Sequence, residues 1–588
     1  MIVLARRILA RRRSSGRAPR ALHIIAGTVL CAVAACQPRM GTPPAPAPRP
    51  ATSDASPETR MPRDTIHIDQ LRRAALDGSH AEPVGTSIDD IGGATARMDA
   101  IREAGYRESS TPVVLPDVAR EFRGVWVATV HNMDWPSSRN LTTAEAQQEL
   151  IAILDAAHDL GLNAVIFQVR PAADALYASD IEPWADYLTG EQGRAPDPYW
   201  DPLAFAVTEA HARGLELHAW FNPFRAGFVA KKAPPAATHV IRRRPDLIRR
   251  YGTHYWMDPA EPDARQQALD VISDVVRRYD IDAVHLDDYF YPYQERDARG
   301  RLIQFPDDGT WRRYGVQTGM TRADWRRANI DAFVEQLYEA VHRIKPHVRV
   351  GISPFGIWRP GHPESVRGLD SYTELYADSR KWLANGWADY YAPQLYWRTH
   401  APQQDYATLL QWWSDQNDHG RHIWAGNIPN NISGGSRGWD ASEILEQISL
   451  TREQPGASGN IHFSASSLLR NPDGLGDAFR ERIYAEPALV PASPWLSPGR
   501  LLPPVVSLRQ DPARGRTAVE LEPLPAATTW IVRARSGSQW RTQLVPAGTH
   551  EIHVEWVDGW PADAIAVSAV DRAGVEGVAA VFERITAQ

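Results

Sequence analysis

The stretch AVHLDDYFYPY, residues 283–293, begins as an apolar run and ends in acidic and aromatic residues. Side chains alternate along a strand, so Val284 and Leu286 fall on one face while His285 and Asp287 fall on the other. In a parallel strand covered by a helix, the apolar face packs against that helix and the polar face points into a barrel interior or towards its rim. The stretch therefore predicts a buried strand that carries carboxylates to the edge of a sheet.

The central part of the chain repeats this pattern of an apolar run, a polar or Gly/Pro-rich turn and an amphipathic helix. Strands are expected at 122–130, 163–170, 215–224, 283–291, 349–355, 389–397, 422–427 and 460–466, with helices at 143–160, 202–213, 261–279, 322–344 and 442–453. Such alternation is typical of βα units and a parallel sheet. Residues 119–485 are therefore predicted to form an α/β domain, a (β/α)8 or TIM barrel. A doubly wound open sheet is the alternative, but no Gly-rich phosphate loop follows the first strand.

Polar and aromatic side chains gather where these strands end, and barrel enzymes carry their sites at that edge. The residues expected to meet there are Asp134, Arg170, His218, Asn222, His285, Asp287, Asp288, Tyr289, Gln394, Tyr396 and Trp397. A single His or Trp at a strand end is more often a packing residue, and a single Asp is more often a helix cap. Their convergence, with 21 Trp and 19 Tyr against 13 Phe, favours a carbohydrate groove, because indole and phenol rings stack on sugar rings.

Several motifs in this region resemble one family. They are FRGVWVAT at 122–129, DWP at 134–136, FQVRP at 167–171, HAWFNPFR at 218–225 and HLDDYFYP at 285–292. In this order they resemble the glycosyl hydrolase-like 10 family of bacterial lipoproteins, over about residues 121–484. The resemblance implies a TIM-barrel glycoside hydrolase acting on glycan strands, in particular peptidoglycan chains freed of their stem peptides.

A more distant similarity to family-eighteen chitinases bears on mechanism. Their fourth strand carries Asp, Asp and a terminal acid Glu at alternate positions, which correspond here to His285, Asp287 and Tyr289, so the acid Glu is absent. Glycoside hydrolysis usually needs one carboxyl group to protonate the leaving oxygen and a second to attack or stabilise the sugar. We expect Asp287 to stabilise or attack the oxocarbenium-like centre, and Asp288 to be the acid, with a pKa raised by desolvation.

Other side chains are expected to hold the substrate. Arg170, His218, Asn222, Gln394 and Tyr396 are predicted to bind sugar hydroxyl or acetamido groups, the last two by similarity to a chitinase pair, and Trp397 to provide a stacking floor. Asp134, His285 and Tyr289 are also predicted to contact the substrate. Reserve acids, each as readily a partner in a loop salt bridge, are Asp134, Asp174, Glu182 and Glu295.

Two further hypotheses stay open. The missing Glu at Tyr289 allows a catalytically silent carbohydrate-binding lipoprotein. His218, His285 and Asp287 allow a metal-dependent polysaccharide deacetylase, although no short-spaced ligand motif supports one. No metal ion or cofactor is expected in the leading hypothesis, and a net charge of −7 argues against nucleic acid as a partner.

The N-terminal region of the chain predicts an exported protein that is tethered to a membrane. Residues 1–36 combine an Arg-rich start with a short apolar run, which is typical of a signal peptide, and end in VAAC, which resembles the bacterial lipobox. Cys36 is the expected lipidation (palmitate) site, with unlipidated cleavage as the alternative. Gln37 after it favours, by resemblance to an enterobacterial sorting rule, an outer-membrane anchor facing the periplasm. Residues 37–118 are expected to be a Pro/Ala-rich tether and a region of unassigned role, with a helix near 94–103.

The C-terminal segment, residues 500–588, is predicted to be a small all-β sandwich. Short strands are expected at 505–508, 517–521, 529–534, 549–554 and 564–569. The ending VSAVDRAG, residues 567–574, resembles the last hairpin of fibronectin type III domains, which implies a spacing or binding module rather than a catalytic one.

Overall fold

The structure, a computed structural model, describes residues 88–585 apart from 232 and 434–437. The predicted signal peptide, Cys36 and the Pro/Ala-rich tether lie outside these residues. The chain divides into two units, Met1–Ala96 and Arg97–Gln588. Apart from the first part of helix α4 (Ile88–Glu103), every element below belongs to the second unit. Within the described ranges, no helix combines the length and the apolar character needed to cross a bilayer.

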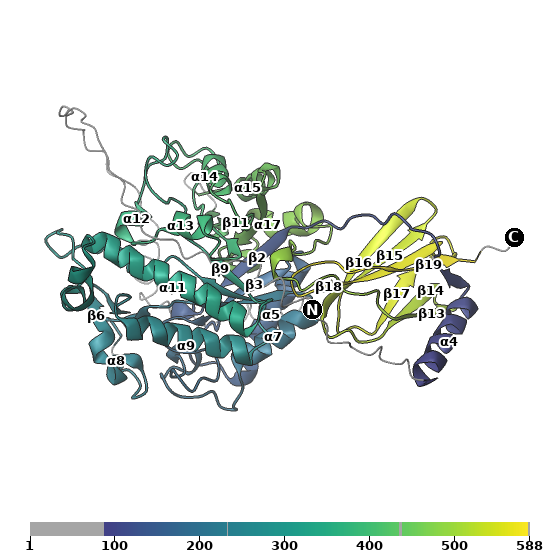
Figure 1. Ribbon diagram of the computed structural model, residues 1–588, viewed down its shortest axis with the longest axis horizontal. Coiled ribbons are helices and arrows are strands. Elements are labelled where there is room, and N and C mark those ends of the chain that lie inside the picture. Colours follow the sequence, from purple (N-terminus) through teal and green to yellow (C-terminus); the bar gives the residue numbers. More distant parts are fainter. Residues whose placement is uncertain (1–87, 232, 434–437, 586–588) are drawn as a thin grey trace, which may run out of the picture. The chain divides into compact units, whose positions relative to one another are not determined.

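Eight parallel strands close into a barrel, which confirms the predicted (β/α)8 fold (Figure 1). Each expected strand is present, and most are shorter than expected at the carboxyl end, where the chain turns into loops. The strands are β2 (Phe122–Val127), β3 (Ala164–Arg170), β4 (Glu216–Phe221), β8 (Ala283–Leu286), β9 (Arg349–Ile352), β10 (Tyr390–Tyr391), β11 (His422–Asn427) and β12 (Ala457–His462). The alternation on β8 is as predicted, since Val284 and Leu286 lie in the outer core and Ala283 in a separate inner cluster.

Helices cover the outside of the barrel. The main ones are α5 (Thr143–Asp159), α7 (Pro202–Ala212), α9 (Pro262–Arg278), α11 (Arg322–Ile344), α14 (Tyr406–Asp415) and α15 (Ala441–Glu453). Helix α5 begins at a capping box, in which the Thr142 hydroxyl accepts from the Glu145 amide and the Glu145 carboxylate accepts from the Thr142 amide. Helices α9 and α11 pack side by side, and α11 covers β9 (Figure 1). Short helices are α6 (Asp186–Thr189), α8 (Val240–Arg243), α10 (Asp308–Thr310), α12 (Ser371–Glu374), α13 (Ser379–Ala384), α16 (Ala465–Leu469) and α17 (Leu475–Ala478).

A small antiparallel sheet is inserted after β4, and the sequence did not predict it. It has the order β5 (Arg225–Phe228), β7 (His254–Met257) and β6 (Ile248–Tyr251). The indole of Trp256 in β7 donates to the Phe290 carbonyl at 3.0 Å, which ties the insert to the loop after β8. This insert therefore brings Arg225 and Phe228 to the carboxyl edge of the barrel.

All-β sheets follow the barrel, as predicted. One has the order β13 (Val506–Asp511), β14 (Arg516–Leu521) and β17 (Glu551–Glu555). The other has the order β1 (Tyr106–Glu108), β19 (Ala580–Arg584), β18 (Ala564–Asp571), β15 (Ala527–Ser536) and β16 (Gln539–Pro546). Strand β1, from the segment without an assigned role, pairs antiparallel with β19. Strand β16, an edge strand whose alternate side chains are exposed and polar, was not predicted from the sequence. The fibronectin type III assignment stays a prediction.

Candidate active site

Asp287 follows β8 directly and is held as a hydrogen-bond acceptor. Its Oδ2 accepts from the Trp220 indole at 3.0 Å and from the Asn222 amide, and its Oδ1 accepts from the Tyr289 backbone amide at 3.1 Å. Burial raises the pKa of Asp287, while the Arg225 charge and these donors oppose that rise. Because all three partners donate, they favour the ionised carboxylate in one orientation.

A second layer of hydrogen bonds fixes the amide of Asn222. Its Oδ1 accepts from Gln168 Nε2 at 2.7 Å and from an Arg225 guanidinium nitrogen at 2.6 Å. Gln168 Oε1 in turn accepts from the backbone amides of Thr129 and Val130 at 2.9 and 2.8 Å. Since two donors occupy the Asn222 oxygen, its NH2 group must face Asp287. Residues on or directly after strands β2, β3 and β4 thus together fix the orientation of the Asp287 carboxylate.

Asp288 lies beside Asp287 in a different environment. The hydroxyl of Tyr293 donates to its Oδ2. Burial and, next to it, the negative charge of Asp287 raise the pKa of Asp288 to about 7. This is the direction expected from the sequence. A carboxyl group that is partly protonated near neutral pH is suited to general acid catalysis.

Aromatic residues surround the two carboxylates. The Tyr289 ring lies 5.3 Å from the Arg225 guanidinium and 5.3 Å from the Tyr293 ring. Burial, followed by the charges of Asp288 and Asp287, raises the pKa of Tyr396, whose ring centre lies 6.2 Å from that of Phe463. Trp397 follows it in the chain and stands edge-on to Phe355 at 5.7 Å. Half-buried Gln394, whose side chain also lowers the pKa of Asp288, completes this group.

His218 and His285 occupy the barrel interior instead of the rim. Both Nδ1 atoms lie 2.9 Å from the Tyr390 hydroxyl. His285 Nε2 accepts from the Trp126 indole at 3.1 Å, and His218 Nε2 lies 3.0 Å from Glu216. Both histidines are fully buried, and all their ring nitrogens have protein partners. Among the described residues no three potential ligands gather around a metal position, so the deacetylase hypothesis has no ligand set there.

Arg170 and Asp134 support loops at the rim. The buried Arg170 guanidinium donates to both Glu182 oxygens, at 2.7 and 2.6 Å. Asp134 accepts from the Ala128 amide at 2.8 Å and from the Ser464 hydroxyl at 2.7 Å, which joins the loops after β2 and β12. Their predicted contact with substrate is untested, and these bonds assign them a positioning role.

The remaining reserve acids are also engaged. Glu295 accepts from the Thr253 hydroxyl at 2.9 Å. Asp174 accepts from Gln192 at 2.7 Å, and its burial raises its pKa to about 7.

Four residues of the site were missing from the predicted set. Trp220 and Gln168 lie on the inward faces of β4 and β3. Strand parity places Trp220 on the same face as His218 and Asn222, but the predicted set did not include it. Arg225 and Tyr293 lie beyond the barrel strands, in an insert and a loop. Alternation along a barrel strand therefore cannot predict where their side chains point.

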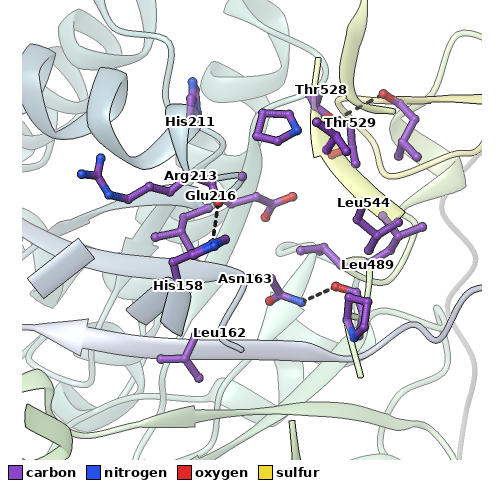
Figure 2. Close-up of a pocket in the computed structure, with 18 of the residues that line it drawn as sticks. His158, Leu162, Asn163, His211, Arg213, Glu216, Leu489, Thr528, Thr529 and Leu544 are labelled. Atoms are coloured by element: carbon purple, nitrogen blue, oxygen red, sulfur yellow. Dashed lines mark hydrogen bonds between the residues drawn. The ribbon is translucent and has the colours of Figure 1, made fainter. Parts of the chain in front are cut away.

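A cavity of about 740 Å³ lies elsewhere (Figure 2). Its walls include Asn163 and Glu216, which stand at the amino ends of β3 and β4, together with Thr528, Thr529 and Leu544 of the C-terminal sheets. Asp287 follows the carboxyl end of β8, at the opposite edge of the barrel. Barrel enzymes use that opposite edge for chemistry, so this cavity is not the candidate active site.

Comparisons with known proteins identify a family and relatives for this chain. The model of the family glycosyl hydrolase-like 10 matches residues 121–435. The glycosyl hydrolase YngK of Bacillus subtilis is 41% identical over 386 residues, which cover 64% of this chain and 74% of YngK. The glycosyl hydrolase DigH of Escherichia coli K12 is 37% identical over 329 residues, covering 52% of this chain and 72% of DigH. Among solved structures, the PgaB glycoside hydrolase domain of Bordetella bronchiseptica is 13% identical with a TM-score of 0.41, covering 62% of this chain and 98% of that domain.

Proposed function

The chain belongs to the glycosyl hydrolase-like 10 family and is a glycoside hydrolase, and from this premise we propose that Asp287 and Asp288 carry the reaction on peptidoglycan glycan strands freed of stem peptides. The substrate rests on the motif resemblance at residues 122–129, 218–225 and 285–292. The proposal includes an exported protein anchored through lipidated Cys36 in the outer membrane and facing the periplasm. The Arg-rich start and the VAAC sequence support that location.

The observation that carries the proposal is the difference between two adjacent carboxyl groups. Asp288, with a pKa of about 7, keeps a proton available near neutral pH. Burial raises the pKa of Asp287 as well, but the Arg225 charge and three hydrogen bonds oppose that rise and favour the ionised form. Glycosidases separate the roles of their two carboxyl groups in this way, one as proton donor and one as nucleophile or charge stabiliser.

The roles follow from these environments. Asp288 donates its proton to the glycosidic oxygen as the bond to the sugar breaks. Asp287, oriented by Trp220 and Asn222, stabilises the positive charge that develops on the sugar ring or attacks the anomeric carbon. Water then adds to that carbon and returns a proton to Asp288. Tyr396 and Trp397 line the same rim, where aromatic surfaces favour a sugar ring.

The test is to incubate the chain from Gln37 onward with peptide-free glycan strands and to separate the products by chromatography. Wild type and an Asp180→Asn control, which changes an exposed carboxylate, are expected to release the same oligosaccharides. Asp287→Asn and Asp288→Asn are expected to release none above background. A wild type that binds insoluble glycan but releases no product would instead identify a binding protein and refute the hydrolytic proposal.

A further inference from the structure

Two consecutive residues after β2 have an unusual backbone. His131 has φ 57° and ψ 19°, and Asn132 has φ 54°. Residues other than glycine rarely adopt this left-handed region, and asparagine tolerates it better than histidine. Such conformations persist only where surrounding contacts impose them, and they cluster at functional sites.

The contacts that impose this turn come mainly from Asn132. Its side-chain NH2 donates to the carbonyl oxygens of Pro136 and Tyr187, both at 2.8 Å, and its Oδ1 accepts from Arg139 at 3.2 Å. The side chain of Asn132 therefore stabilises the turn itself. His131 makes none of these bonds, so its presence at a strained position needs a separate reason.

The imidazole of His131 is oriented but has no hydrogen-bond partner within the described ranges. Its ring centre lies 4.4 Å from that of Phe228 and 5.9 Å from that of Tyr187, while the residue stays exposed. These contacts restrict its rotamer before any ligand binds, which lowers the entropic cost of forming a new hydrogen bond.

A series of contacts connects this ring to the reactive carboxylate. The Arg225 guanidinium lies 5.7 Å from the Phe228 ring centre and 5.3 Å from the Tyr289 ring centre. The same guanidinium donates to Asn222, the residue that aims Asp287. His131 and the carboxylate pair therefore belong to one rim.

The protonation state of the His131 imidazole suits hydrogen bonding to a sugar. Desolvation of the imidazole by the groups packed against it, followed by the charges of Arg225 and Arg139, lowers the pKa of His131 to about 4, although part of the residue stays exposed. At neutral pH its ring therefore has one nitrogen that donates and one that accepts. Sugar hydroxyl and acetamido groups offer both complements.

We propose that His131 forms a sugar-binding subsite adjoining the Asp287 and Asp288 pair, in which its imidazole hydrogen-bonds a hydroxyl or acetamido group of a glycan ring outside the reacting one. The inference rests on the proposed function and adds a specificity determinant to it. Longer oligosaccharides reach the subsite, whereas the shortest cleaved substrate does not.

The experiment measures KM and kcat for glycan oligosaccharides of increasing length with wild type, His131→Ala and His131→Asn. For the longer substrates we expect His131→Ala to raise KM about tenfold, or about 1.4 kcal/mol, with kcat within twofold and no change for the shortest substrate. His131→Asn retains a hydrogen-bonding amide and suits the left-handed backbone, so it should lose less affinity and match or exceed the wild-type melting temperature. His550→Ala, an exposed histidine of the C-terminal sheets, is the matched control.

The outcomes distinguish a failure of the proposed function from a failure of the proposed His131 subsite. If wild type releases no products, the proposed function fails and this inference fails with it. If wild type cleaves glycans and both His131 variants keep the wild-type KM at every length, only the subsite is refuted. An equal loss of kcat at all lengths would also refute it, because His131 would then act on the reactive carboxylates. Should His131→Ala fail to fold, the length dependence of His131→Asn decides.

Discussion

Asn222→Ala tests whether the hydrogen bonds behind Asp287 aim that carboxylate. The substitution removes the amide that donates to Asp287. It also deprives Gln168 and Arg225 of an acceptor at 2.7 and 2.6 Å. Asn222 is fully buried, so these groups lose their partner away from bulk water.

The size of the effect follows from those three bonds. A buried polar group left without a partner costs about 1–3 kcal/mol, and water entering the vacated space recovers part of that. We therefore expect the free energy of unfolding to fall by about 2–4 kcal/mol. Misplacing a reacting group by about 1 Å can lower the rate about 100-fold, and we expect kcat to fall by a factor of that order.

The assay combines steady-state hydrolysis of glycan oligosaccharides with chemical denaturation. Asn140→Ala, at an exposed asparagine, should match wild type in both measurements. A folded Asn222→Ala variant that is less stable but keeps the wild-type kcat would refute the reasoning, because Asn222 would then serve packing alone. An increase in KM with unchanged kcat would show that Asn222 contributes to substrate binding instead of orienting Asp287.

Three further outcomes follow from the same site. Since Asp288 must be protonated to act as the acid, kcat/KM of wild type should fall as pH rises through about 7, and a rate that is flat from pH 6 to pH 8 would contradict that role. Tyr293→Phe removes a donor that lowers the pKa of Asp288, so the alkaline fall in rate should move to higher pH, and a shift to lower pH would be the wrong sign. Arg170→Met leaves Glu182 buried without its partner and should lower the free energy of unfolding by about 3–5 kcal/mol in chemical denaturation, an expectation that a loss below 1 kcal/mol would contradict.

Local patterns were sufficient for the elements of the barrel. Strands such as β11 (His422–Asn427) and helices such as α11 (Arg322–Ile344) have the bounds expected from the sequence. Apolar alternation and amphipathic periodicity can be read from neighbouring residues alone. Burial of the apolar face stabilises such a strand or helix wherever it packs in the fold. The insert strands β5, β6 and β7 have only four residues each, too few to show a periodic pattern. Strand β16 does alternate in exposure, but Gln539, Arg541 and Gln543 hold its exposed positions and Thr542 one of the half-buried ones.

The candidate site shows the limit of that local information. Alternation correctly grouped His218, Trp220 and Asn222 on the inward face of β4, but it says nothing about depth along the barrel axis. His218 lies four residues before Asn222, about 13 Å at 3.3 Å per residue, and meets Tyr390 in the interior. Asn222 reaches Asp287 at the rim.

By itself, the sequence determined a (β/α)8 barrel with an adjacent carboxylate pair at the end of its fourth strand, because periodicity and chain order are local properties. Only the tertiary structure decided which residues support that pair, since Gln168 and Arg225 reach Asn222 from separate segments. It also decided the environment of Asp288, whose pKa depends on burial by residues distant in the chain and on the charge of Asp287. Depth, burial and charge proximity are set by packing, and no pattern of neighbouring residues encodes them.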